Sequence, residues 1–127
     1  MEYETTIGLE VHAQVVTASK MFCGCSADYA NAEPNTHVCP VCLGLPGALP
    51  VINQRAIERV AETGLALSCT INKNNIISRK QYFYADLPSN YQRTQYEDPI
   101  CSHGVVTIGA GDNTKHIGIT RVHMEED

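Results

Sequence analysis

The sequence lacks the signals that direct a protein into or across a membrane. No apolar run approaches the length needed to span a bilayer. The first four residues, Met-Glu-Tyr-Glu, contain neither the basic stretch nor the apolar stretch of a signal peptide. Six cysteines without a secretory signal favour a reducing compartment, where thiols bind metals or lie in the core. We therefore expect a cytoplasmic protein with no membrane partner.

The sequence also lacks a basic surface and a phosphate-binding loop. Nine lysines and arginines stand against fourteen acidic residues, which gives a formal net charge of −5. A domain that binds nucleic acid by itself usually carries a basic face, so any large nucleic-acid footprint must lie outside this sequence. Neither of the usual glycine-rich phosphate loops occurs, so a nucleotide would need another kind of site.

The composition that remains is that of an ordinary globular protein. The 127 residues are 43% hydrophobic and 18% charged, without internal repeats or low-complexity segments, which suits one domain. One amphipathic helix is expected over 53–67, where apolar residues recur at helical spacing and Asn53 can serve as the N-cap. Gly64, late in this run, indicates close packing or fraying.

Strands are expected on both sides of this helix. Ile7, Leu9 and Val11 alternate with Gly8, Glu10 and His12, which predicts a strand over 5–17 with one buried face. After Cys69 the pattern is β-like in four runs, 70–77, 81–84, 105–108 and 115–124. The last two runs are typical of a hairpin closed by the glycine-rich loop 109–113. The sequence therefore predicts an α+β fold, mostly antiparallel, with one main helix.

The last expected strand changes phase along its length. Ile117 and Ile119 share one parity, whereas Val122 and Met124 have the other. A β-bulge near residues 120–121 would place all four side chains on the core side. The polar residues after the bulge would then project from the opposite side.

Four of the six cysteines form two close pairs in a loop, 21–47, that is rich in glycine, proline and asparagine. The pairs are Cys23–Cys25 and Cys39–Cys42, separated by thirteen residues. Each pair can occupy one edge of a tetrahedron, so the spacing indicates a zinc site that staples the loop. The alternatives are buried thiols or, in an oxidising setting, disulfides. His37 is interpreted as a surface residue rather than a spare ligand.

The two remaining cysteines, Cys69 and Cys101, are isolated in the sequence. Free cysteine is commonly a small buried hydrophobe. Neither is accompanied by a histidine and an asparagine in a pattern that suggests a nucleophile. We expect both thiols to lie in the core.

Two carboxylate–imidazole pairs lie near the two ends of the chain. Glu10 and His12 are two residues apart, and so are His123 and Glu125, which are followed by two more acidic residues. Such a pair can bind a divalent cation or act as an acid/base pair, and each alone is also typical of a solvated strand. If the first and last strands lie side by side, repulsion among the carboxylates would call for a cation such as Mg²⁺.

A basic dipeptide precedes an aromatic cluster in Arg79-Lys80-Gln81-Tyr82-Phe83-Tyr84. One interpretation is a strand with a core-facing aromatic side. The other is a wall on which a base or an adenine stacks while Lys80 meets a phosphate. The pattern alone does not decide between them.

Several runs, taken in order, resemble one family. They are 7–12 (Ile-Gly-Leu-Glu-Val-His), 22–25 (Phe-Cys-Gly-Cys), 33–36 (Glu-Pro-Asn-Thr), 38–51 (Val-Cys-Pro-Val-Cys-Leu-Gly-Leu-Pro-Gly-Ala-Leu-Pro-Val), 79–84, 86–88 (Asp-Leu-Pro) and 122–127 (Val-His-Met-Glu-Glu-Asp). Together these resemble the start of the B subunit of the glutamyl/aspartyl-tRNA amidotransferases, from about residue 5 to residue 127.

The resemblance implies an ATP-dependent carbon–nitrogen ligase with glutamine as the amido donor. Such a subunit phosphorylates the side chain of Glu or Asp misacylated onto tRNA(Gln) or tRNA(Asn). Ammonia released from glutamine by the A subunit then displaces phosphate, and both subunits are braced by the C subunit. Residues 1–127 would be the N-terminal portion of the catalytic cradle domain. The helical and tRNA-binding tail domains would lie outside it, so this part alone is expected to be inactive.

The resemblance also implies roles for individual residues. In the family the cradle holds Mg²⁺ through the Glu-x-His strand and the His-x-Glu-Glu-Asp segment, which here means Glu10, His12 and Glu125, with His123 close by. Lys80 corresponds to a lysine near the channel exit and the phosphates, and Arg79 precedes it at the cofactor site. The four cysteines correspond to the zinc site of many members.

Departures from the family pattern are few. Ala85 replaces a proline, and Ser89-Asn90 replace Lys-Gly, a lysine that the family places near the ammonia route. Arg93 stands where an apolar residue is common. A non-catalytic zinc-stapled binding or assembly module is the main alternative. A disulfide-stapled extracellular domain is disfavoured by the missing signal peptide.

Overall fold

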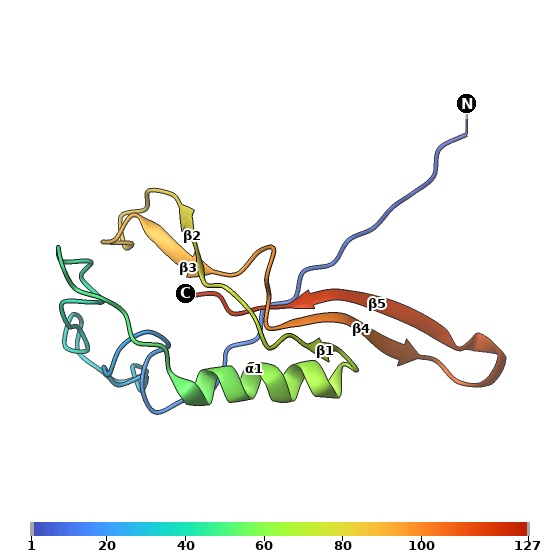
Figure 1. Ribbon diagram of the computed structural model, residues 1–127, viewed down its shortest axis with the longest axis horizontal. Helices are drawn as coiled ribbons and strands as arrows, with labels where there is room; N and C mark the ends of the chain where they lie inside the picture. The colour runs from blue at the N-terminus through green and yellow to red at the C-terminus, as the bar shows by residue number, and fades with distance from the viewer. Residues whose placement is uncertain (1, 127) are drawn as a thin grey trace.

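The computed structural model describes residues 2–126, which contain one α-helix and two antiparallel sheets (Figure 1). The helix α1 (Gln54–Ala66) begins as predicted, because the Asn53 side chain accepts a hydrogen bond of 2.9 Å from the Arg55 amide. The same side chain donates to the Ser19 carbonyl at 3.0 Å. Asn53 therefore caps the helix and ties its start to Ser19, just before the cysteine-rich loop 21–47.

The larger sheet has the strand order β1-β4-β5 and lies against α1. Strand β1 spans Thr70–Ile71, β4 spans Cys101–Ile108 and β5 spans Lys115–Val122. The expected hairpin is confirmed, with β4 and β5 joined through the short 3₁₀ turn Gly111–Asn113. In Figure 1 this hairpin extends well beyond the helix, and its outer half is exposed to solvent.

The smaller sheet pairs β2 (Ser78–Gln81) with β3 (Tyr91–Thr94). The predicted strand over 81–84 is wrong, because β2 ends at Gln81 and the aromatic residues that follow lead into a turn. Strand β3 was not predicted. It reads Tyr-Gln-Arg-Thr and lacks apolar alternation, yet its last three residues are buried because their polar groups find partners.

The core is small and lies between α1 and the larger sheet. Its buried members are Ala56, Val60, Cys69, Ile100, Cys101 and Met124. The prediction that both isolated cysteines are buried hydrophobes is confirmed, and burial raises the pKa of each thiol. Gly64 marks close packing: a Cβ there would lie 2.3 Å from the Cys101 Sγ. The predicted α+β fold is confirmed.

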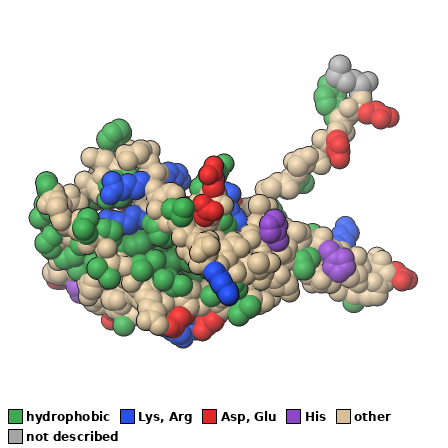
Figure 2. Space-filling view, in the orientation of Figure 1, with side chains coloured by type: hydrophobic (Ala, Val, Ile, Leu, Met, Phe, Trp, Pro, Cys, Tyr) green, Lys and Arg blue, Asp and Glu red, His purple; other side chains and the backbone are tan. Residues whose placement is uncertain are grey.

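The strand predicted over 5–17 is wrong within the described residues. The segment has no helix or strand assignment, and its first part is extended and projects away from the rest of the molecule (Figure 1), clear of the remaining surface in the space-filling view (Figure 2). Its alternating side chains Ile7, Leu9 and Val11 are 78–87% exposed. The period-2 pattern is a strand pattern, but no described segment supplies the neighbour that a strand requires.

The predicted β-bulge is also wrong. The register of β4 with β5 is the same on both sides of the suspected position, with Ser102 opposite Arg121 and Gly104 opposite Ile119. Between them His103 adopts a left-handed φ of 56° and the ladder is interrupted. Ile119 and Val122 both pack against the core, so this local distortion produces the change of phase without an extra residue.

No helix among residues 2–126 is long and apolar enough to cross a membrane.

Candidate metal centre and candidate active-site face

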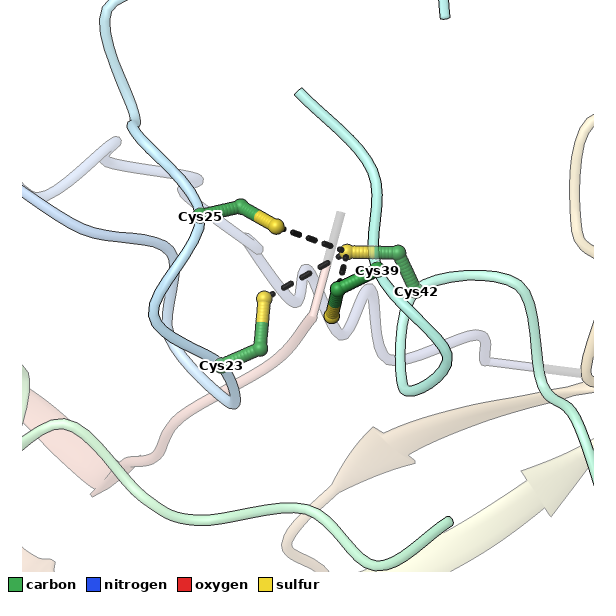
Figure 3. Close-up of side chains that lie close together, drawn as sticks. All are labelled: Cys23, Cys25, Cys39 and Cys42. Atoms are coloured by element: carbon green, nitrogen blue, oxygen red, sulfur yellow. Dashed lines mark hydrogen bonds between the residues drawn. The ribbon is translucent and has the colours of Figure 1, made fainter. Parts of the chain in front are cut away.

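The four cysteines converge as predicted (Figure 3). The Sγ atom of Cys42 lies 3.3 Å from that of Cys23, 3.7 Å from that of Cys39 and 3.8 Å from that of Cys25. All four sulfurs lie within 4.8 Å of one another. A tetrahedral ion with metal–sulfur bonds of about 2.3 Å would hold its sulfurs about 3.8 Å apart. The cluster therefore fits a tetrahedral metal ion.

Two tight turns present these cysteines. In the first, the Lys20 amide donates to the Cys25 carbonyl at 2.9 Å, and residues 19 and 26 form a β-bridge. In the second, the Leu43 amide donates to the Cys39 carbonyl at 3.0 Å, and Gly44 has a left-handed φ of 64°. Because backbone hydrogen bonds fix both turns, the four sulfurs are preorganised.

The electrostatics of the cluster suit a metal rather than disulfides. All four cysteines are reduced, and their closest sulfurs are much farther apart than the roughly 2.05 Å of a disulfide bond. A backbone hydrogen bond from Cys42 lowers the pKa of Cys39 to about 7. Burial raises the pKa of Cys23 to about 12 and also raises that of Cys25. Burial thus favours the protonated form of Cys23 and Cys25, and a divalent metal would favour the thiolate form instead.

Lys20 and His37 lie beside the cluster. The Lys20 Nζ atom donates to the His37 carbonyl at 2.7 Å and lies 3.7 Å from the Cys42 sulfur. This ammonium group contributes positive charge next to the sulfurs. His37 is half-buried, so its interpretation as a surface residue is only partly right. It is not among the residues whose ligand atoms come together.

The second group of interest lies where the C-terminal segment runs beside β3. Residue 125 forms a β-bridge with Thr94, and the Thr94 hydroxyl donates to the Glu125 Oε2 at 3.0 Å. The Nε2 atom of His123 is 3.7 Å from the same Oε2. Both side chains of this carboxylate–imidazole pair are only about a fifth to a quarter exposed, at 21% and 24%. The fold therefore orients the pair.

Strand register places Lys80 on the same side as this pair. Lys80 is opposite Gln92, and Thr94, two residues further along β3, is opposite Glu125. Residues that face each other across antiparallel strands point to the same side, and so do residues two apart on one strand. We call this side, with Lys80, Gln92, Thr94 and Glu125, the Lys80–Glu125 face. Arg79 and Arg93 point to the opposite side.

The aromatic cluster does not form a core face. Phe83 and Tyr84 are 82% and 70% exposed, which excludes the core interpretation for these two residues. The Lys80 Nζ atom lies 5.9 Å from the Tyr82 ring centroid, and the Arg79 guanidinium lies 4.4 Å from that of Tyr91. Figure 2 shows basic and hydrophobic side chains next to one another on the left of the view, where the smaller sheet lies. Each of these two cations therefore lies over a half-buried ring, and the exposed rings of Phe83 and Tyr84 follow directly in the chain.

Glu10 and His12 lie apart from Glu125. They contact each other at 3.6 Å on the projecting N-terminal segment, and both are about three-quarters exposed. Among the described residues, only the four cysteines bring three or more potential metal-ligating groups together. The structure does not bring this pair to Glu125, and the magnesium site stays a prediction.

The departure at residues 89–90 has a local structural explanation. Asn90 adopts a left-handed φ of 59° in the turn between β2 and β3. Asparagine tolerates this conformation better than other residues with a Cβ, which explains how it can replace a glycine. Ser89 lies against Gly44, where a Cβ would come within 2.9 Å of its Cα. The turn therefore packs on the cysteine-rich loop.

Fold and site together define a class: an α+β domain with four clustered cysteines that could hold a metal ion and an oriented carboxylate–imidazole pair. A family model described as "GatB/GatE catalytic domain" matches residues 5–127. The chain belongs to this family, as the resemblance predicted.

Curated relatives agree with the family match. The chain is 69% identical over 127 residues to the B subunit of the aspartyl/glutamyl-tRNA(Asn/Gln) amidotransferase of Roseiflexus castenholzii and 60% identical to that of Thermomicrobium roseum. The alignments cover 100% of this chain and 26% of each relative. The chain thus spans about a quarter of the length of these relatives.

Proposed function

We propose that the chain is part of the catalytic domain in the B subunit of an ATP-dependent tRNA amidotransferase. In this proposal the complete subunit phosphorylates the side chain of Glu-tRNA(Gln) or Asp-tRNA(Asn). Ammonia from the A subunit then replaces the phosphate and gives Gln-tRNA(Gln) or Asn-tRNA(Asn). The observation that carries the proposal is 69% identity, along the whole chain, to a protein with this name.

The Lys80–Glu125 face supports a catalytic role for this part of the subunit. A lysine and an oriented carboxylate share it, and phosphoryl transfer depends on positioned cations and on carboxylates that hold metal ions. We propose that Lys80 meets phosphate oxygens, that Arg79 assists at the nucleotide site, and that Glu125 with His123 orients the reacting groups. The exposed rings of Phe83 and Tyr84, which follow Lys80 closely in the chain, suit the stacking of a base.

Glu10 and His12 complete this site in our proposal. Glu10 offers carboxylate oxygens and His12 an imidazole nitrogen, which are ligands that a divalent cation accepts. Their segment alternates apolar and polar residues as a strand does, but its apolar side chains are exposed. When bound, Mg²⁺ would neutralise phosphate charge and orient the carboxylate that attacks ATP. We propose that this segment pairs as a strand in the complete subunit and that pairing brings Glu10 and His12 to Glu125.

The four-cysteine cluster is proposed to bind structural zinc. Thiolates and tetrahedral geometry favour zinc, and four protein ligands leave no open position for a substrate. The zinc would staple the loop 21–47, whose own apolar burial is slight. Zinc at the four cysteines would thus stabilise the structure, whereas Mg²⁺ at the separate carboxylate site would take part in the reaction.

The remaining assignments follow from the proposed function. The A subunit would supply ammonia, the C subunit would brace the assembly, and misacylated tRNA would bind mainly through parts of the protein outside this chain. A net charge of −5 agrees with that division. Reduced cysteines support a cytoplasmic location.

The test uses the complete B subunit assembled with its A and C partners, supplied with ATP, Mg²⁺, glutamine and Glu-tRNA(Gln). We expect Glu10→Ala and Glu125→Ala to abolish Gln-tRNA formation while glutaminase activity stays measurable. Glu62→Ala, on the exposed side of α1, is the matched control and should amidate normally. Normal Gln-tRNA formation by the Glu10 and Glu125 variants would refute the site. A wild-type assembly without amidation would favour the assembly-module alternative.

A further inference from the structure

Arg93 is a buried charge in a strand that the sequence does not mark as buried. Its side chain is 7% exposed, and its Nη1 atom lies 2.6 Å and 2.9 Å from the two carboxylate oxygens of Glu126. The carboxylate itself is 28% exposed. A charge-assisted contact shielded from water in this way is stronger than a surface ion pair and strongly directional.

The backbone reinforces this ion pair. The Arg93 amide donates to the Glu126 carboxylate at 3.2 Å, and the Glu126 amide donates to the Arg93 carbonyl at 2.9 Å. The Gln92 side-chain amide donates to the Glu126 carbonyl. Side chain, amide and carbonyl of Glu126 are therefore all held by β3. Neither the position nor the rotation of this residue can change without breaking several contacts.

Holding Glu126 also sets the direction of Glu125. Neighbouring residues of an extended chain point to opposite sides. Glu126 points toward Arg93, so Glu125 must point to the Lys80–Glu125 face, where the Thr94 hydroxyl meets it at 3.0 Å. If the Glu126 contact were lost, the segment could rotate or slip and turn Glu125 away from that face.

The same guanidinium reaches the cysteine-rich loop. It lies 5.4 Å from the ring centroid of Phe22, which is 5% exposed and directly precedes Cys23. Figure 3 shows the Cys23 side chain reaching into the sulfur cluster. A cation over a buried ring is favourable only while the ring stays in place. The Arg93 side chain thus contacts both the cysteine-rich loop and the His123–Glu126 segment.

We propose that Arg93 is a positioning residue: it locks Glu126 against β3, fixes the direction of Glu125, and links that carboxylate through Phe22 to the four-cysteine cluster. The structural link stands on these contacts alone. Its consequence for the reaction rests on the proposed function.

The link is tested by hydrogen exchange in the complete subunit, without any activity measurement. Chelation of zinc should accelerate exchange in residues 122–126 at least tenfold in the wild type. In Arg93→Met the same residues should exchange fast with or without zinc. Residues 60–66 of α1 serve as the internal control and should change little. An equal response of 122–126 in both proteins, no response in the wild type, or equal acceleration of 60–66 would overturn the link.

The consequence for the reaction is tested by the Mg²⁺ dependence of amidation. Arg93→Met should raise the Mg²⁺ concentration for half-maximal rate at least tenfold, and Arg93→Lys should raise it less, because lysine keeps the charge but not the planar donor group. Arg59→Met, which breaks an exposed ion pair with Glu62 at 2.8 Å, is the control and should behave as wild type.

A double variant separates positioning from stability. Replacing both ends of a buried ion pair often restores stability, so Arg93→Met with Glu126→Leu should recover resistance to urea. It should not recover the wild-type Mg²⁺ dependence, because the ion pair that sets the direction of the Glu125 side chain is then missing. Recovery of both properties together would show a purely structural role and overturn the proposal. If the wild type does not amidate at all, the proposed function fails, and the exchange experiment still decides the link.

Discussion

Gln95 provides the sharpest test of how the fold holds the His123–Glu126 segment. Its side chain is 2% exposed, and its Oε1 atom accepts from the amides of Ile100 and Met124, both at 3.2 Å. Its Nε2 atom donates to the Asn75 side chain at 3.2 Å. The Gln95 side-chain amide thus joins the end of β3, the loop before β4 and the start of the His123–Glu126 segment.

Gln95→Leu keeps the approximate volume and removes the acceptor. Two buried backbone N–H groups then lose their partner, at about 1–3 kcal/mol each, so we expect a loss of about 2–6 kcal/mol. Where local opening governs exchange, even 2 kcal/mol would speed the Ile100 and Met124 amides about 30-fold. The Val105 amide, bonded to the Leu67 carbonyl at 2.9 Å, is the internal control.

Gln95→Glu keeps the acceptor and adds a buried titratable group. Burial without a cation should raise the pKa of the new carboxyl above its unfolded value of about 4.3. The folded state then binds more protons than the unfolded state, so stability falls as pH rises between the two pKa values. We expect urea unfolding of the complete subunit to show Gln95→Glu nearest to wild type at low pH. Unchanged exchange in Gln95→Leu, or a Gln95→Glu variant most stable at high pH, would refute this reasoning.

Three further outcomes are expected. The chain should bind about one zinc, and chelation should unfold loop 21–47 before the helix, as limited proteolysis would report; reduced protein without zinc would contradict the site. Cys42→Ser, which removes the most central sulfur, should lower the zinc content measured by elemental analysis. Gly64→Ala should cost about 1–3 kcal/mol in urea unfolding, because the added methyl group meets Cys101, and an unchanged midpoint would show that the interface yields.

The sequence predicted those features whose chemistry is local. Asn53 caps the helix because a side-chain acceptor and the following amides are three residues apart or fewer. Within each cysteine pair, the short spacing and the turn residues keep the two sulfurs near each other. The β4–β5 hairpin follows from alternation around a glycine-rich turn. Each of these needs only neighbours in the chain.

The tertiary structure decided the features that depend on partners distant in sequence. Strand β3 has no apolar alternation, and its burial depends on Glu125 and Glu126, more than thirty residues away, which satisfy its polar groups. For the opposite reason, the strand pattern of 5–17 forms no strand among the described residues, because a strand needs a neighbour as well as a pattern. The sequence by itself determined which residues could bind metals and phosphates. Only the tertiary structure decided which of them share a face, because strand register, and not sequence spacing, places Lys80 on the same face as Glu125 and turns Arg93 to the other side.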